Sequence, residues 1–248
     1  MKSSLPKVMH EIGNLPLVGH VMRAALAAGC DRIAVVAGPG HEATVALAKK
    51  RSNQVETFEQ TKRLGTAHAV LAARKALEKH ADDVIVLFGD TPFMSARSIA
   101  AMRAELAAGA SVVVGGMRPD DPSGYGRLIE DGGTLVAIRE HQDASETERA
   151  IGFCNGGIMA FDGKTILTIL DRIGDSNAQG EFYLTDAVEV AGEAGLKAIA
   201  IELPVADLIG INDRIQLADA EARVQASMRE NARRDGATLI DPDNVYVS

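Results

Sequence analysis

Short runs of apolar residues alternate along this chain with longer stretches of helical periodicity. The runs are five or six residues long and rich in valine, isoleucine, alanine and leucine, with little polar alternation. Continuous apolar strands are typical of a parallel sheet that helices cover on both faces. Since strands that alternate with helices build βαβ units, the pattern predicts a three-layer, Rossmann-like α/β fold with a mostly parallel sheet.

The apolar periods give the predicted elements their bounds. The predicted strands are 32–36, 54–58, 84–88, 111–115, 157–161 and 198–203. The predicted helices are 16–28, 42–51, 65–80, 96–108, 164–173, 184–194 and 213–229. Gly29 and Gly195 stand where a glycine commonly ends a helix.

One segment breaks this alternation. Residues 127–140 have the pattern of two strands joined by an Asp-Gly-Gly turn, which predicts a β-hairpin inserted into the domain. We expect the excursion 121–144 to face substrate. Without repeats or linkers, residues 1–248 are predicted to be one domain, in which 237–241 is a strand that begins a truncated following element.

Charge and cysteine content exclude several classes of partner. The 248 residues have a formal net charge of −8, which argues against a nucleic-acid or membrane-surface partner, because both require a basic face. The two thiols, Cys30 and Cys154, are far apart in sequence and indicate a reduced, cytoplasmic protein. No apolar run is long enough for a membrane helix, and no signal peptide is predicted. A homo-oligomer is left open.

Three motifs have the residue types that phosphate and metal binding need. Lys7 follows Pro6 near a helix start, where its ammonium can lie beside phosphates, although a solvated lysine is the plainer interpretation. Thr66 begins helix 65–80, whose N-terminal N–H groups suit a base edge or a phosphate, or it is simply an N-cap. Asp90 follows a buried strand, the usual place of ligands in open α/β sheets.

A metal role for Asp90 is favoured over a helix cap. Gly89 lets the backbone approach a ligand closely, and Pro92 fixes the exit of the chain. Mg²⁺ prefers hard oxygen ligands and phosphates. Asn212 could add a neutral oxygen, while the neighbouring Asp213 fits an N-cap.

A second group of residues suits a sugar. Residues 124–127 contain two glycines around an aromatic side chain, which exposes backbone N–H groups just before the hairpin. Glu140 ends the hairpin and could accept hydrogen bonds from sugar hydroxyls, or it is a surface charge. The amide of Asn155 both donates and accepts, which suits a hydroxyl or an N-acetyl group, and a turn is equally consistent with it.

In their order and contexts these motifs resemble the N-terminal uridylyltransferase domain of the bifunctional N-acetylglucosamine-1-phosphate uridylyltransferase/glucosamine-1-phosphate acetyltransferase family. The likeness spans Leu5 to about Asn244, and residues 177–186 together with 124–127 are its most specific part. It implies the nucleotide-diphospho-sugar transferase fold and Mg²⁺ as cofactor.

The resemblance also implies a role for individual positions. Lys7 would contact phosphate and act in catalysis. The uridine-binding positions would be Gln60, Gly65 and Thr66; the Mg²⁺ ligands Asp90 and Asn212; and the sugar-binding positions Gly126, Glu140 and Asn155.

The chain also departs from that family. The glycine-rich signature loop and its preceding strand are absent, and so is the β-helix acetyltransferase domain. Phe88 stands for a usual tyrosine and Gly156 for a usual threonine. A misassigned start, a split gene, degeneration and truncation all fit, and each leads us to expect a poor enzyme or an inactive one.

The implied reaction joins UTP and N-acetylglucosamine 1-phosphate into UDP-N-acetylglucosamine and pyrophosphate. Two alternatives remain open. One is a nucleotidyltransferase of the same fold with another sugar 1-phosphate or a cofactor precursor as substrate. The other is a protein that binds a nucleotide sugar, or another subunit, without catalysis.

Overall fold

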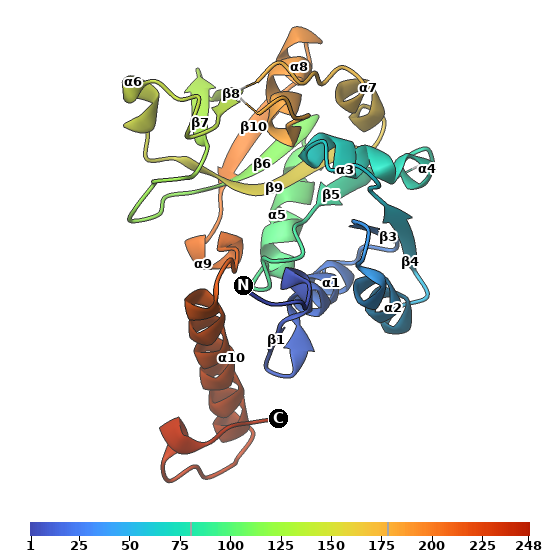
Figure 1. Cartoon of the computed structure of the whole chain (residues 1–248). Coiled ribbons are helices and arrows are strands. Elements are labelled where there is room, and N and C mark those ends of the chain that lie inside the picture. Colours follow the sequence, from blue (N-terminus) through green and yellow to red (C-terminus); the bar gives the residue numbers. More distant parts are fainter. Residues whose placement is uncertain (80, 178) are drawn as a thin grey trace.

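A mixed six-stranded sheet forms the centre of the molecule (Figure 1). The computed structural model describes residues 1–79, 81–177 and 179–248. The strands lie in the order β10, β6, β9, β7, β8, and β5 pairs with β9. Their bounds are β5 (Asp83–Val86), β6 (Val112–Met117), β7 (Arg127–Asp131), β8 (Thr134–Arg139), β9 (Cys154–Asp162) and β10 (Ala198–Glu202).

Strand β9 sets the topology of this sheet. It pairs antiparallel with β6 on one side and with β5 on the other, so β5 and β6 run in the same direction without touching. β10 pairs parallel with β6. The predicted α/β fold is confirmed, and so is the hairpin, formed by β7 and β8.

Helices cover both faces of the sheet. They are α1 (Leu17–Ala27), α2 (Glu42–Arg51), α3 (Thr66–Ala72), α4 (Arg74–Leu77), α5 (Ala96–Ala107), α6 (Glu146–Arg149), α7 (Ile166–Leu170), α8 (Ala187–Glu193), α9 (Val205–Leu208) and α10 (Arg214–Arg234). Side chains of β6 alternate between two cores: Val112 and Val114 pack with α7 and α8, whereas Val113 packs with α5. Because successive side chains of a strand point to opposite faces, this alternation makes three layers.

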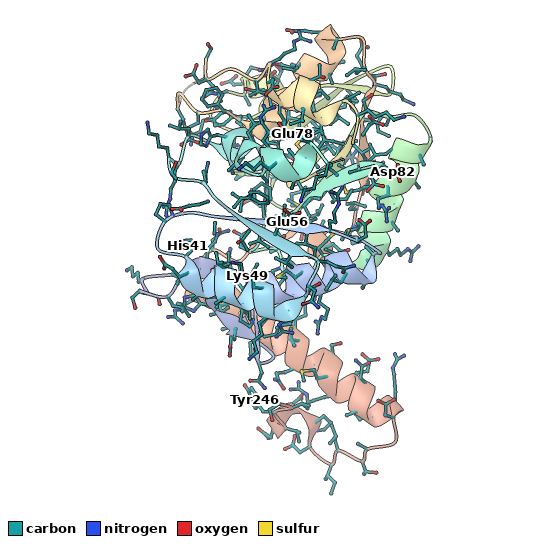
Figure 2. The ribbon with its side chains drawn as sticks, turned by 90° about the vertical axis from the view of Figure 1, so that its right-hand side faces the viewer. His41, Lys49, Glu56, Glu78, Asp82 and Tyr246 are labelled. Atoms are coloured by element: carbon teal, nitrogen blue, oxygen red, sulfur yellow. The ribbon has the colours of Figure 1, made fainter. Side chains whose placement is uncertain are left out.

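Strands β3 (Ile33–Ala37) and β4 (Val55–Glu59) form a separate parallel pair. Figure 2 shows α2, with Lys49, beside β4, which carries Glu56. Among the described residues no strand pairs with the other side of β3 or with the free side of β5. Arg103 links the start of β5 to the end of α1, since it donates to Asp83 Oδ2 (2.9 Å) and to the carbonyl of Ala28 (3.1 Å).

A cavity of about 750 Å³ separates β3 from β5. Both strands line it along their whole lengths. Apolar side chains of α1 and of the α3–α4 region close it from the two faces of the sheet, among them Val21, Met22, Val70 and Leu77.

The C-terminal helix α10 projects from the body, and the chain folds back beside it (Figure 1). Its base packs on the small hairpin of β1 (Glu11–Ile12) and β2 (Leu15–Pro16), where Glu221 accepts a hydrogen bond from the N–H of Gly13 (2.6 Å). Gln225 exchanges two hydrogen bonds with the backbone of Val247. Tyr246, labelled in Figure 2, lies exposed on this terminal segment.

Three predictions of elements need correction. Helix 65–80 is broken at Ala73, where i→i+3 hydrogen bonds replace the α-helical ladder, and His80 lies outside the described residues. Helix 184–194 begins with a 3₁₀ turn, η2 (Leu184–Asp186). The predicted strand 237–241 does not form: the N–H of Ala237 bonds back to the carbonyl of Ala232 at the end of α10 (2.9 Å) instead of to a sheet edge.

No helix in the described ranges is long and apolar enough to cross a membrane.

Candidate functional site

Lys7, Asp90 and Asn212 converge beyond the end of β5. Lys7 lies in the 3₁₀ turn η1 (Lys7–Met9), directly after Pro6. Its ammonium pairs with the Asp90 carboxylate and donates to Asn212 Oδ1 (2.9 Å). The N–H of Ile211 donates to the carbonyl of Asp90 (2.9 Å), which joins the loop after β5 to the loop before α10. The fold therefore brings together three predicted site residues that are up to 205 positions apart in the sequence.

This cluster fits a hard divalent cation. One carboxylate and one amide oxygen already face a common positive charge, the Lys7 ammonium. Mg²⁺ is commonly held by one or two protein oxygens, with phosphates and waters completing its octahedron. Across the described residues no group of three or more His, Cys, Asp or Glu side chains is placed to hold a metal, so a larger all-protein cage is not formed.

The predicted uridine positions lie together at the start of α3. The side-chain amide of Gln60 donates to the carbonyl of Gly65 (3.0 Å), and Thr66 Oγ1 accepts from the N–H of Leu184 (2.8 Å). Gly65 has φ of 110°, and a Cβ there would lie 2.5 Å from the carbonyl oxygen of Phe182. Only glycine fits such a position. Gly65, rather than Thr66, is the N-cap of α3.

The predicted sugar positions also come together. The N–H of Asn155 donates to the carbonyl of Gly126 (2.8 Å). A Cβ on Gly126 would lie 3.4 Å from Glu140 Oε2 and 3.5 Å from Asn155 Cβ, so the missing side chain leaves space between these two polar groups. Asn155 Oδ1 accepts from the N–H of Gly157 (2.9 Å), and among the described residues no acceptor is found for its amide hydrogens.

Half-buried carboxylates lie beside these predicted sugar positions. Burial raises the pKa of Glu140, although a hydrogen bond from Thr185 (3.2 Å) partly opposes this effect. Burial, with the nearby charges of Glu189 and Glu140, raises the pKa of Asp186 to about 6. Burial also raises the pKa of the Tyr183 phenol. The surroundings of Glu140 and Asp186 therefore favour neutral or cationic groups over additional negative charge.

Contacts connect the three groups into one site. Lys7, Gln60 and Thr66 line the cavity between β3 and β5. Phe88, at the end of β5, also lines it, and its ring lies 3.3 Å from where a Cβ on Gly157 would stand. The predicted phosphate, base and sugar positions thus lie beyond the carboxyl ends of β5, β4 and β6, since Asn155 pairs with Gly116 near the end of β6. Ligands of α/β sheets bind at this edge.

Sequence reasoning missed several supporting residues. His68 forms a hydrogen bond with Gln60 (3.1 Å), and Thr185 donates one to Glu140. The residues of each pair are not separated by a spacing from which a contact could be predicted. Arg127 is buried and holds the loop before the hairpin by donating to the carbonyls of Tyr125 and Arg149. In the motif 177–186, Ala178 lies outside the described residues.

Comparisons with known proteins place these features in one class, the nucleotidyltransferases. Residues 1–173 match the MobA-like NTP transferase domain, and the chain belongs to that family. The whole chain also aligns with bifunctional GlmU proteins, at 51% identity with that of Brucella anthropi, 53% with that of Bradyrhizobium sp. ORS 278 and 52% with that of Xanthobacter autotrophicus. It spans 55% of the length of each of these relatives.

A solved structure supports the fold alone. A Bacillus anthracis protein assigned as a glucose-1-phosphate thymidylyltransferase superposes with a TM-score of 0.68, over 96% of this chain and 90% of that one, at 19% identity. At this identity the likeness concerns the arrangement of strands and helices.

Proposed function

We propose that this chain transfers a uridylyl group from UTP to N-acetylglucosamine 1-phosphate, giving UDP-N-acetylglucosamine and pyrophosphate. One observation carries the proposal: Lys7, Asp90 and Asn212 converge on one point. On one side lie the predicted uridine-binding residues, which line the cavity, and on the other lie the predicted sugar-binding residues. Oxygens that suit a cation and a lysine that suits phosphate stand next to polar groups that suit a sugar. Such a site fits a sugar linked to a nucleotide through phosphates. The alignment with GlmU proteins over the whole chain points to the same substrates.

Each group of residues has a task in this proposal. Lys7 neutralises phosphate charge beside the reacting centre. Glu140 and Asn155 hold sugar hydroxyls and the N-acetyl group, in the space that the absent side chain of Gly126 leaves open. Asp90 and Asn212 would hold Mg²⁺, which when bound neutralises charge on the phosphate oxygens.

The chemistry needs no general base from the protein. An oxygen of the sugar phosphate, already an anion, forms a new bond to the α-phosphorus of UTP. The bond from that phosphorus to the bridging oxygen of the β-phosphate breaks, and pyrophosphate leaves with the electron pair. The protein contributes position and charge stabilisation, which dominate catalysis of phosphoryl transfer.

A substrate panel tests this proposal. Pyrophosphate release is measured with UTP, CTP, ATP and dTTP, each paired with N-acetylglucosamine 1-phosphate or glucose 1-phosphate. We expect UTP with N-acetylglucosamine 1-phosphate to give the highest kcat/KM. A higher value for another pair would favour a nucleotidyltransferase of different substrate. Saturable binding of UDP-N-acetylglucosamine without release from any pair would favour the non-catalytic alternative.

A further inference from the structure

Gln60 is held rigidly beside the cavity. It directly follows β4, and its backbone N–H donates to the carbonyl of Ala37 (2.9 Å), which extends the pairing of β3 with β4 by one step. Its half-buried side chain lines the cavity near Thr66. A side chain on such an anchor can present a fixed hydrogen-bonding atom to a ligand.

Both hydrogens of the Gln60 carboxamide are already used. Nε2 lies 3.0 Å from the carbonyl oxygen of Gly65 and 3.1 Å from Nδ1 of His68. Because the carbonyl of Gly65 can only accept, the carboxamide must turn its NH₂ group to this side. Within the described part of the chain, no donor reaches Gln60 Oε1, so this oxygen remains an acceptor for a ligand.

The contact with His68 requires one tautomer. An NH₂ group only donates, so Nδ1 of His68 must accept and the imidazole proton must lie on Nε2. The ring is also packed: its centroid lies 6.5 Å from that of Phe182. The backbone of Phe182 is in turn fixed by hydrogen bonds with Leu64 (2.8 Å) and Ala67 (2.9 Å).

We propose that His68 is a positioning residue that fixes the orientation of the Gln60 carboxamide and thereby selects the base. A flipped carboxamide would place its oxygen against the Gly65 carbonyl, which can only accept, and against Nδ1 of His68 in the tautomer with the proton on Nε2. The fixed orientation presents Oε1 to the cavity as an acceptor. Gln60 Oε1 would accept a hydrogen bond from the N3–H of uracil, and it would repel the lone pair that cytosine has at N3. The inference rests on the proposed function, since it assumes that a nucleotide base lies beside Gln60.

Two variants separate hydrogen bonding from packing. His68→Phe keeps an aromatic ring against Phe182 and removes the acceptor. His68→Gln removes the ring but keeps an acceptor oxygen for the Gln60 amide. Affinities for UTP and CTP are measured by titration calorimetry on the full chain with Mg²⁺, so that the test does not depend on turnover. The tautomer of His68 is read from its ¹⁵N chemical shifts in the native, ligand-free chain.

The expected results differ between the two variants. The preference for UTP over CTP falls about fivefold in His68→Phe, the factor for one net hydrogen bond, and is retained in His68→Gln. The ¹⁵N shifts show an unprotonated Nδ1. An equal preference in all three proteins, or a protonated Nδ1, overturns the inference while the proposed function stands. A native chain that does not prefer UTP overturns both.

Discussion

At the residue scale, the candidate site depends on the ion pair between Lys7 and Asp90. Asp90 and Lys7 lie 83 positions apart, and the loop after β5 brings the carboxylate to the ammonium. In the proposed reaction this carboxylate has two neighbours, the Lys7 ammonium and a Mg²⁺ ion bound to phosphate. Its loss should therefore affect chemistry more than folding, because about a fifth of its side-chain surface is still exposed.

The first prediction concerns Asp90→Ala. Metal-dependent product formation should fall by ~10²-fold or more, as is usual when a charge-stabilising group is removed. Turnover is measured against Mg²⁺ concentration. Asp171→Ala, which removes an exposed carboxylate that pairs with Arg74, is the matched control and should keep native turnover. Native turnover of Asp90→Ala at saturating Mg²⁺ would contradict the metal assignment.

The second prediction separates sugar from nucleotide. Asn155→Ala removes an amide whose Cβ borders the space beside Gly126, while Lys7 and Gln60 are untouched. The KM for N-acetylglucosamine 1-phosphate should rise and the KM for UTP should stay nearly unchanged. Steady-state kinetics with each substrate varied in turn give both values. Equal effects on the two substrates would show that the residue does not belong to a separate sugar pocket.

The third prediction is a pH dependence of stability. The pKa of Asp186 is raised from 3.8 to about 6 by burial first, then by Glu189, Glu140 and Asp143, with Arg139 opposing. The folded state therefore binds more protons than the unfolded state, and stability from this group is lost as pH rises from 3.8 through about 6.

Asp186→Asn removes the charge without removing a helix cap, since its side chain makes no cap hydrogen bond to α8. Tm should rise in the variant at pH 8, and the difference from the native chain should shrink at pH 4. Thermal unfolding followed by circular dichroism at both values measures this. A variant less stable than the native chain at pH 8 would mean that the carboxylate is stabilising there.

At the element scale, the unpaired sides of β3 and β5 are the feature of most consequence. Unpaired ladder groups and apolar side chains that face a cavity are costly unless another strand covers them. Both strands line the cavity along their whole lengths, and apolar side chains of α1 and of the α3–α4 region close it from the two faces of the sheet. This shape suits one more extended apolar strand between these two.

The fourth prediction uses that shape. An apolar strand and a glycine-rich loop, fused ahead of Met1, should slow amide hydrogen exchange in β3 and β5, raise Tm and speed turnover. Rate should improve more than affinity, because charge on the leaving pyrophosphate develops mainly in the transition state. The control fusion carries prolines at alternate strand positions, which cannot complete the ladder. Equal turnover of the chain with and without the fusion would contradict the account.

Elements with strong periodicity could be predicted from the sequence, and those decided by tertiary contacts could not. The apolar run at 111–115 became β6, and helix 42–51 was right at both ends. The break at Ala73 has no glycine or proline to mark it. The antiparallel direction of β9 was not foreseen, because an apolar run has no direction until its partners are known.

The candidate site divides in the same way. Asp90 was predicted from its place after a buried strand, and Asn155 from its two-way amide. Their neighbours were beyond reach, since the hydrogen bond from Thr185 to Glu140 joins residues 45 positions apart. The candidate side chains could be chosen by their residue types. The neighbours that orient these side chains depend on tertiary packing and could not be predicted.

At the scale of the whole molecule, one end of the sheet carries every proposed task. Phosphate, base and sugar groups lie beyond the carboxyl ends of the strands, and α10 with the terminal segment extends away from them (Figure 1). The account therefore places chemistry in the α/β body, and a change on the projecting arm should leave it unaffected.

The central claim is uridylyl transfer, and ³¹P NMR of the full chain with UTP, N-acetylglucosamine 1-phosphate and Mg²⁺ tests it most directly. The account predicts that UDP-N-acetylglucosamine and pyrophosphate appear in equal amounts, at a rate proportional to protein concentration and lost in Asp90→Ala. Orthophosphate in place of pyrophosphate, or the absence of product even from the chain with the fused strand and loop, would contradict it.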